Sequence, residues 1–111
     1  MVSGPYTSGA RSEAERAENL RVLNRAALAL HRAGHVPIIG VNLALPIIDS
    51  AGPDAFDGIM MPLSLALAER CDACLRVGGP SRGADEEVAR FVAAGKPVFG
   101  SLHEVPAVAL G

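Results

Sequence analysis

The sequence predicts one α/β domain built on a parallel sheet, and three observations support this fold class. Short apolar runs alternate with longer segments of helical periodicity, as in βα units that are joined by right-handed crossovers. The chain has 111 residues, which is close to the commonest size of a single domain. Half of its residues are hydrophobic, so it can bury a real core. We therefore expect one domain over residues 1–111.

The first third of the chain is predicted to contain a short strand and a long helix. Residues 1–3 form a very short first strand. Ser12 and Glu15 have the spacing of a capping box, which marks a helix start. Gly34 is the expected stop, because glycine readily adopts the left-handed conformation that ends many helices. The helix is therefore expected to run from Ser12 to about Ala33.

Prolines and glycines divide the rest of the chain. The apolar run 36–39 is typical of a second strand. Residues 41–50, which include Pro46, are expected to form an extended loop, and residues 52–54 a turn. The remaining predicted elements are a helix over residues 62–71, a strand over 73–77, a helix over 84–94, a strand over 97–99 and a short helical turn over 102–105.

Charge and hydropathy exclude several classes of partner. Ten basic and twelve acidic residues give a net charge of -2, so no basic surface field attracts nucleic acid or anionic lipid. The longest apolar stretch is interrupted by Pro62 and Ser64 and is shorter than the roughly 20 residues that span a bilayer. The amino terminus shows no secretory signal pattern. We expect a cytoplasmic protein that binds neither nucleic acid polymers nor membranes.

Cys71 and Cys74 form a CxxC pair, which in other proteins can bind zinc or carry out dithiol chemistry. A structural zinc site needs four ligands, and His31 and His35 lie far away in the sequence. A redox pair usually opens a helix, whereas Cys71 is predicted to close a helix and Cys74 to enter a strand. We therefore expect two reduced, buried thiols, no metal site and no cofactor.

The segment between the third predicted strand and the third helix gives the strongest indication of a binding site. A glycine-rich turn over residues 78–83 leads into the acidic start of a helix. Backbone amides in such a turn can hold an anion. In a parallel sheet, this turn and the turn over residues 3–6 open at the carboxyl edge, where such folds bind ligands. The expected site contains a phosphate cradle, a phenol and a carboxylate.

Five stretches of the chain resemble one enzyme family. They are SGPY at 3–6, ALHRAGHVPI at 29–38, CDACLRV at 71–77, SRGADEE at 81–87 and AGKPVF at 94–99. Together they resemble the nucleoside 2-deoxyribosyltransferase superfamily, in particular its short bacterial members and the nucleoside 5'-monophosphate N-glycosidases, over residues 2–106. The resemblance implies a single-domain flavodoxin- or Rossmann-like three-layer sandwich with a four- to five-stranded parallel sheet.

The resemblance also implies roles for individual residues. Gly83 to Glu87 matches the family signature, which makes Glu87 the nucleophile-like carboxylate. Tyr6 is implied to orient it, and Asp72 to act as an acid/base or hydrogen-bond partner on the base or sugar side. The implied substrate contacts are Ser81, Arg82 and Gly83 to a 5'-phosphate or sugar 5' group, and Ser3, Gly4 and Arg11 on the opposite wall. Asn42, beyond the second predicted strand, is a further candidate contact to base or sugar.

The chemistry explains why a carboxylate is needed. Cleavage of the bond between ribose C1' and a base nitrogen passes through an oxocarbenium-like state, which an anionic carboxylate stabilises or traps covalently. We expect Glu87 to lie in the first helical turn, where the positive end of the helix lowers a carboxylate pKa. Three consecutive acids at a helix start also occur simply because they complement the dipole.

Two classes of function remain open. Ser81 and Arg82 suit a phosphate better than a neutral hydroxyl, which favours nucleotide hydrolysis over nucleoside transfer. The turn also resembles the GTxEE element of phosphoribohydrolases, which break the same type of bond. The alternative is a non-catalytic nucleotide-binding or sensor domain. The broad apolar stripe of the first helix and the resemblance both predict a homodimer.

Overall fold

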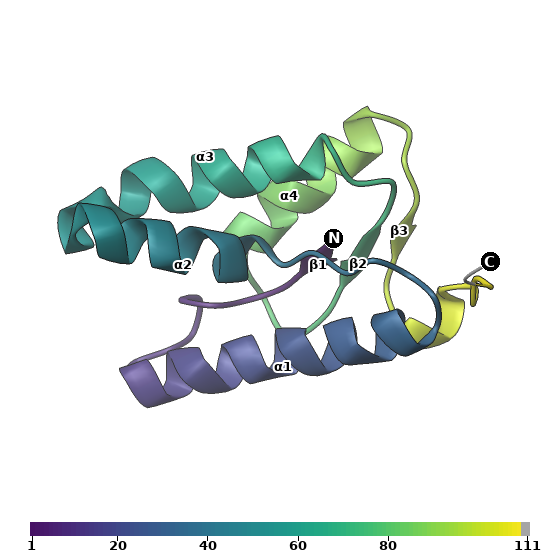
Figure 1. Ribbon diagram of the computed structural model, residues 1–111, viewed down its shortest axis with the longest axis horizontal. Helices are drawn as coiled ribbons and strands as arrows, with labels where there is room; N and C mark the ends of the chain where they lie inside the picture. Colours follow the sequence, from purple (N-terminus) through teal and green to yellow (C-terminus); the bar gives the residue numbers. More distant parts are fainter. Residues whose placement is uncertain (110–111) are drawn as a thin grey trace.

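The computed structural model describes residues 1–109 and shows a mostly helical protein, with 58% helix and one small sheet (Figure 1). Its elements run in the order β1 (Val2–Ser3), α1 (Glu13–Arg32), α2 (Gly40–Ala51), the 3-10 helix η1 (Pro53–Ala55), α3 (Phe56–Ala68), β2 (Cys74–Arg76), α4 (Arg82–Ala93), β3 (Val98–Phe99) and the 3-10 helix η2 (Leu102–Glu104).

The sheet is parallel, with the strand order β1-β2-β3. Val2 pairs with Leu75, and Cys74 pairs with Val98. Successive side chains of a strand point to opposite faces. Val2 and Leu75 therefore pack against α1, whereas Cys74 packs against Phe91 of α4. Figure 1 shows α1 on one side of the sheet and α4 on the other.

The predicted flavodoxin- or Rossmann-like sandwich with four to five strands is wrong, because the described chain contains only three short strands in one sheet. The expected strand over residues 36–39 is not formed. This segment still runs beside β1, where the Val2 amide donates a hydrogen bond of 2.8 Å to the Ile38 carbonyl. Pro37 has no amide hydrogen to give, so a regular ladder does not extend along the segment.

The expected loop over residues 41–50 is also wrong, since these residues lie within α2. Pro46 stands inside this helix, where a proline removes one backbone hydrogen bond. Ala44 and Ile48 on the same helix are buried against Met60 of α3. The helix α3 begins at Phe56, before the predicted start at residue 62. Burial of apolar side chains between α2 and α3 thus outweighs the tendency of Pro46 to interrupt a helix.

Other predicted elements are confirmed. The hydroxyl of Ser12 caps α1 by accepting a hydrogen bond of 3.1 Å from the Glu15 amide. Gly34 follows the helix with φ +96°, a conformation that favours glycine. The helix α4 starts after Ser81, close to the predicted boundary. The strands β2 and β3 lie within the predicted ranges 73–77 and 97–99.

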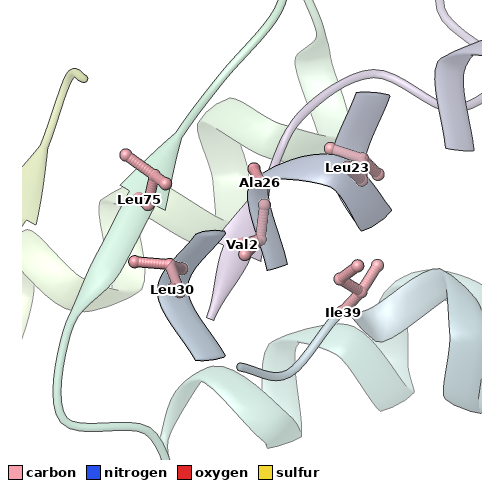
Figure 2. Close-up of a cluster of buried hydrophobic side chains, with 6 residues drawn as sticks. All are labelled: Val2, Leu23, Ala26, Leu30, Ile39 and Leu75. Carbon is pink, nitrogen blue, oxygen red and sulfur yellow. The ribbon is translucent and has the colours of Figure 1, made fainter. Parts of the chain in front are cut away.

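The core consists of apolar clusters on both faces of the sheet and between α2 and α3. Figure 2 shows the first cluster, in which side chains from β1, α1, β2 and the segment before α2 meet. The second cluster surrounds Phe91 and includes Cys71 and Cys74, whose thiols are buried and free, as predicted. No helix within residues 1–109 combines the length and the hydropathy needed to cross a bilayer.

Candidate functional site

A cleft of about 300 Å³ lies at the carboxyl ends of β1 and β2, as the positions of the two turns predicted. Its walls come from the loop after β1, the start of α2, the first half of α3 and the start of α4. Six of the predicted site residues line it: Gly4, Tyr6, Ser81, Arg82, Gly83 and Glu87. The fold therefore brings most of the predicted phosphate cradle, the phenol and the carboxylate together.

Glu87 lies deep in this cleft. It is the sixth residue of α4, in the second turn, and only 8% of its surface is exposed. The hydroxyl of Ser3 donates a hydrogen bond of 2.7 Å to its Oε1 atom. Tyr6 lines the same cleft, but the described residues show no hydrogen bond between its hydroxyl and the carboxylate. Ser3 thus makes the contact to the carboxylate that was expected from the Tyr6 hydroxyl.

Burial raises the pKa of the Glu87 carboxyl above its ordinary value. The Ser3 hydrogen bond, the Met1 amino group and the Arg76 guanidinium oppose this effect, but burial outweighs them. The expected lowering of this pKa by the helix N-terminus is wrong, because Glu87 lies beyond the first turn of α4 and is shielded from water. The neighbouring Cys74 thiol is also buried, which raises its pKa to about 11 and keeps it neutral.

The start of α4 forms the second wall of the cleft. Ser81 caps the helix by accepting a hydrogen bond of 3.1 Å from the Ala84 amide, and its hydroxyl lies 3.3 Å from that of Ser8. The first amides of a helix have no acceptor within it, so those of Arg82 and Gly83 can serve a ligand. The Arg82 side chain is 95% exposed and lies 3.9 Å from Glu86. It is free to turn toward an anion at the rim.

The structure gives Ser3 and Gly4 roles that differ from substrate contact. Ser3 is 1% exposed and does not line the cleft. Gly4 does line it, but a Cβ atom there would lie 2.6 Å from the Val77 carbonyl oxygen and 2.7 Å from Leu23 Cδ2. The glycine is thus needed for close packing of the loop after β1 against β2 and α1.

Three further predicted site residues are not brought to the cleft. Asp72 precedes β2, at the amino end of the sheet, and lines a second cavity of about 520 Å³. Asn42 donates a hydrogen bond of 2.8 Å to Asn24 of α1. The Arg11 amide donates a hydrogen bond of 2.6 Å to Glu15 Oε2, and its side chain is not part of the cleft lining.

The start of α3 supplies a residue that the sequence interpretation missed. Asp57 lies in the first turn of this helix and lines the cleft, together with the apolar side chains of Phe56, Met60 and Met61. Residues 56–61 were not assigned to an element because the helix was predicted to begin at Pro62. The turn Gly52-Pro53 was the available signal, since proline is common in the first turn of a helix.

The described residues contain no group of three or more histidine, cysteine, aspartate or glutamate side chains placed to hold a metal ion. The polar groups that line the cleft are carboxylates, hydroxyls, an arginine and backbone amides. Comparison of this chain with protein-family models, with curated proteins and with solved structures finds no match.

Proposed function

We propose that this protein cleaves the N-glycosidic bond of a nucleoside 5'-monophosphate or nucleoside, by hydrolysis or deoxyribosyl transfer, with Glu87 as the carboxylate beside C1'. One observation carries the proposal. The Glu87 carboxyl is buried in the cleft and held by Ser3, while the glycine-containing start of α4 lines the same cleft. The resemblance of residues 81–87 to the deoxyribosyltransferase signature supports the same role.

The dimensions and polarity of the cleft support a ligand of this class. A volume of about 300 Å³ is at the lower end for small-molecule sites, so it suits a single nucleoside better than a larger cofactor. Arg82 and the first amides of α4 can bind a 5'-phosphate. Phe56 and Met60 offer an apolar surface to a base. Asp57 can accept a hydrogen bond from the sugar or from a base amino group.

The state of Glu87 determines the proposed mechanism. Its ionised form stabilises positive charge that develops on the sugar ring, and a site shielded from water strengthens this attraction. Because burial raises the pKa of this carboxyl, a larger share is protonated at mildly acidic pH. The rate of base release is therefore expected to rise with pH, and the acid limb of its pH profile should lie above the ordinary pKa of a glutamate.

The second candidate function is a nucleotide-binding domain without catalysis. The observation that favours it is the position of Asp72, which lies at the opposite end of the sheet from Glu87. The side chain expected to assist the leaving base is thus not in the cleft. A domain that holds a nucleotide without releasing its base accounts for this arrangement.

Base release from a panel of ribo- and deoxyribonucleoside monophosphates tests the proposal. We expect wild-type protein to release free base and Glu87→Gln to lose about a hundredfold or more of this activity, as when a group that stabilises transition-state charge is removed. Asp85→Asn is the matched control, because Asp85 lies on the same helix but is exposed and does not line the cleft.

Each outcome of this assay distinguishes the two functions. Nucleotide binding by the wild-type protein without base release supports the sensor. Base release that is equal in wild-type and Glu87→Gln protein removes Glu87 from the mechanism.

The proposal includes a homodimer and a cytoplasmic setting. Apolar side chains remain exposed on α1 and α2, among them Leu28 and Leu43. Asn24 and Asn42 join these two helices through their side-chain hydrogen bond. A second copy of the chain that covers this surface would remove the apolar side chains from water. The cytoplasmic setting stays a prediction.

A further inference from the structure

Ser3 occupies an unusual position beside the cleft. It is the last residue of β1, paired with Arg76 of β2, and its side chain is directed to the α4 side of the sheet. With 1% of its surface exposed, it is too deeply buried to touch a ligand. Its hydroxyl has two acceptors in reach, Glu87 Oε1 at 2.7 Å and the Ala84 carbonyl at 3.5 Å. The shorter bond, to a carboxylate, is the stronger one.

This hydrogen bond distinguishes the two oxygens of the carboxylate. Within the described residues, the carboxylate accepts its hydrogen bond at Oε1. Among the described residues, no fully buried side-chain oxygen or nitrogen lacks a hydrogen-bond partner. Oε2 makes no hydrogen bond within the described residues, so it is not fully buried, and Glu87 is part of the cleft lining. Oε2 is therefore the oxygen available to a ligand.

We propose that Ser3 is a positioning residue, which ties Oε1 of Glu87 to β1, favours the ionised carboxylate and leaves Oε2 directed to the ligand. The effect of Ser3 on catalysis rests on the proposed function, whereas its hydrogen bond to the Glu87 carboxylate does not. The proposal replaces the role of substrate contact that the sequence indicated for Ser3. It also replaces the tyrosine as the group that orients the carboxylate.

Other charged and titratable groups surround Glu87, but they act through space or at the rim. They are the Met1 amino group just before β1, Cys74 and Arg76 on β2, Asp57 on α3, Tyr6 in the loop after β1, and Arg82 and Glu86 on α4. The Ser3 hydroxyl is the group that contacts the carboxylate directly. Loss of the Ser3 hydroxyl should therefore change the titration of the Glu87 carboxyl measurably, even in the presence of these other groups.

The test is an NMR titration of Glu87 in protein labelled with ¹³C at the glutamate carboxyl, with Glu87→Gln used to assign the signal. A hydrogen bond to a charged group is worth about 1.5–3 kcal/mol, so Ser3→Ala should raise the apparent pKa of Glu87 by about one to two pH units. Ser3→Thr, which keeps the hydroxyl, should restore a value near that of the wild type.

Two further variants keep the titration decisive. Ser64→Ala is the matched control, because Ser64 is also buried and lines the cleft but makes no hydrogen bond to Glu87. In this variant the Glu87 carboxyl should titrate as it does in the wild type. If a thermal melt shows that Ser3→Ala is unfolded, Ser3→Cys in reducing buffer replaces it, since a thiol is a weak donor. The inference is overturned if loss of the hydroxyl leaves the titration unchanged, or if Ser64→Ala shifts it as much.

The pH profile of base release adds the link to catalysis. With an active wild-type protein, Ser3→Ala should move the acid limb of kcat/KM upward by the same one to two pH units, approximately, as the carboxyl titration. If the wild-type protein releases no base, the proposed function fails, but the titration still decides whether Ser3 controls the carboxyl. An acid limb that does not move although the titration does contradicts the positioning role in catalysis.

Discussion

Glu87 shows how two positions along a helix change the surroundings of a carboxylate. Asp85, in the first turn of α4, stays exposed and lies 3.5 Å from the Arg76 guanidinium. Glu87 lies further along, on the side that faces the sheet, where it meets Ser3 and Cys74. Loss of water around the carboxyl raises its pKa and outweighs the Ser3 hydrogen bond and the nearby positive charges. A carboxyl whose pKa is shifted by burial in a cleft is a candidate functional group, because catalytic acids and bases need pKa values matched to their task.

The raised pKa of Glu87 predicts how stability depends on pH. The folded state binds the carboxyl proton more tightly than the unfolded state, so this stabilisation is complete below the ordinary glutamate pKa. It is lost as the pH rises through the raised pKa of the folded state. Glu87→Gln carries no such proton and can still accept the Ser3 hydrogen bond. We therefore expect this variant to gain stability over the wild type as the pH rises from acid to neutral.

Urea unfolding of wild-type and Glu87→Gln protein between about pH 4 and pH 8 measures this difference. The Asp85→Asn variant serves as the control, since no buried carboxyl is removed there. A free-energy difference between wild type and Glu87→Gln that stays constant over this range, or that shrinks with rising pH, contradicts the raised pKa.

The helices α2 and α3 form the part of the fold that the sequence interpretation described least well. Pro46 and Pro62 lie inside them, and both helices carry very few charged side chains. Ala44 of α2 and Met60 of α3 are buried in one apolar cluster where the two helices pack together. Gly40 at the start of α2 allows this approach, because a Cβ atom there would lie 2.2 Å from the Ser64 hydroxyl oxygen of α3.

A pair of glycine substitutions tests this packing. Gly40→Ala should destabilise the protein by about 1–3 kcal/mol, because the methyl group overlaps Ser64 and forces α2 from α3. Gly58→Ala is the matched control: it is helical, has nothing within 4 Å of an added Cβ atom, and should stabilise by about 0.5–1 kcal/mol. Unfolding midpoints in urea measure both. Equal effects of the two substitutions would show that α2 and α3 are not packed as described.

The cleft with Glu87 and the cavity with Asp72 lie at opposite ends of a short sheet. The strands are only two or three residues long, so α1 and α4 provide most of the cover of the sheet and extend beyond it (Figure 1). The cleft with Glu87 lies at the carboxyl ends of β1 and β2 and the cavity with Asp72 at the amino end of β2. A parallel arrangement puts the turns after β1 and β2 at one edge, which is why these turns share a cleft.

The proposed dimer gives a prediction for the whole molecule. Leu28 on α1 and Leu43 on α2 are 47% and 44% exposed, and a dimer that covers them should show twice the chain mass in light scattering. Leu28→Glu with Leu43→Glu should weaken association at least about tenfold, since buried unpaired charges are costly. Val92→Glu on α4 is the control, because Val92 is an exposed apolar residue on the other side of the sheet. A monomeric wild type at working concentration excludes the dimer.

Local signals sufficed for the features that depend on neighbours in the chain. Ser12 with Glu15 and Gly34 predicted the bounds of α1, and the 81–87 segment predicted the start of α4, because caps and turns are formed within a few residues. Tertiary contacts decided the rest. Pro46 stays helical because α3 covers its helix, and residues 36–39 remain outside the sheet. Glu87 is buried and held by a serine that lies 84 residues earlier in the chain, because strand pairing and helix packing, acting over the whole chain, bring β1 against α4.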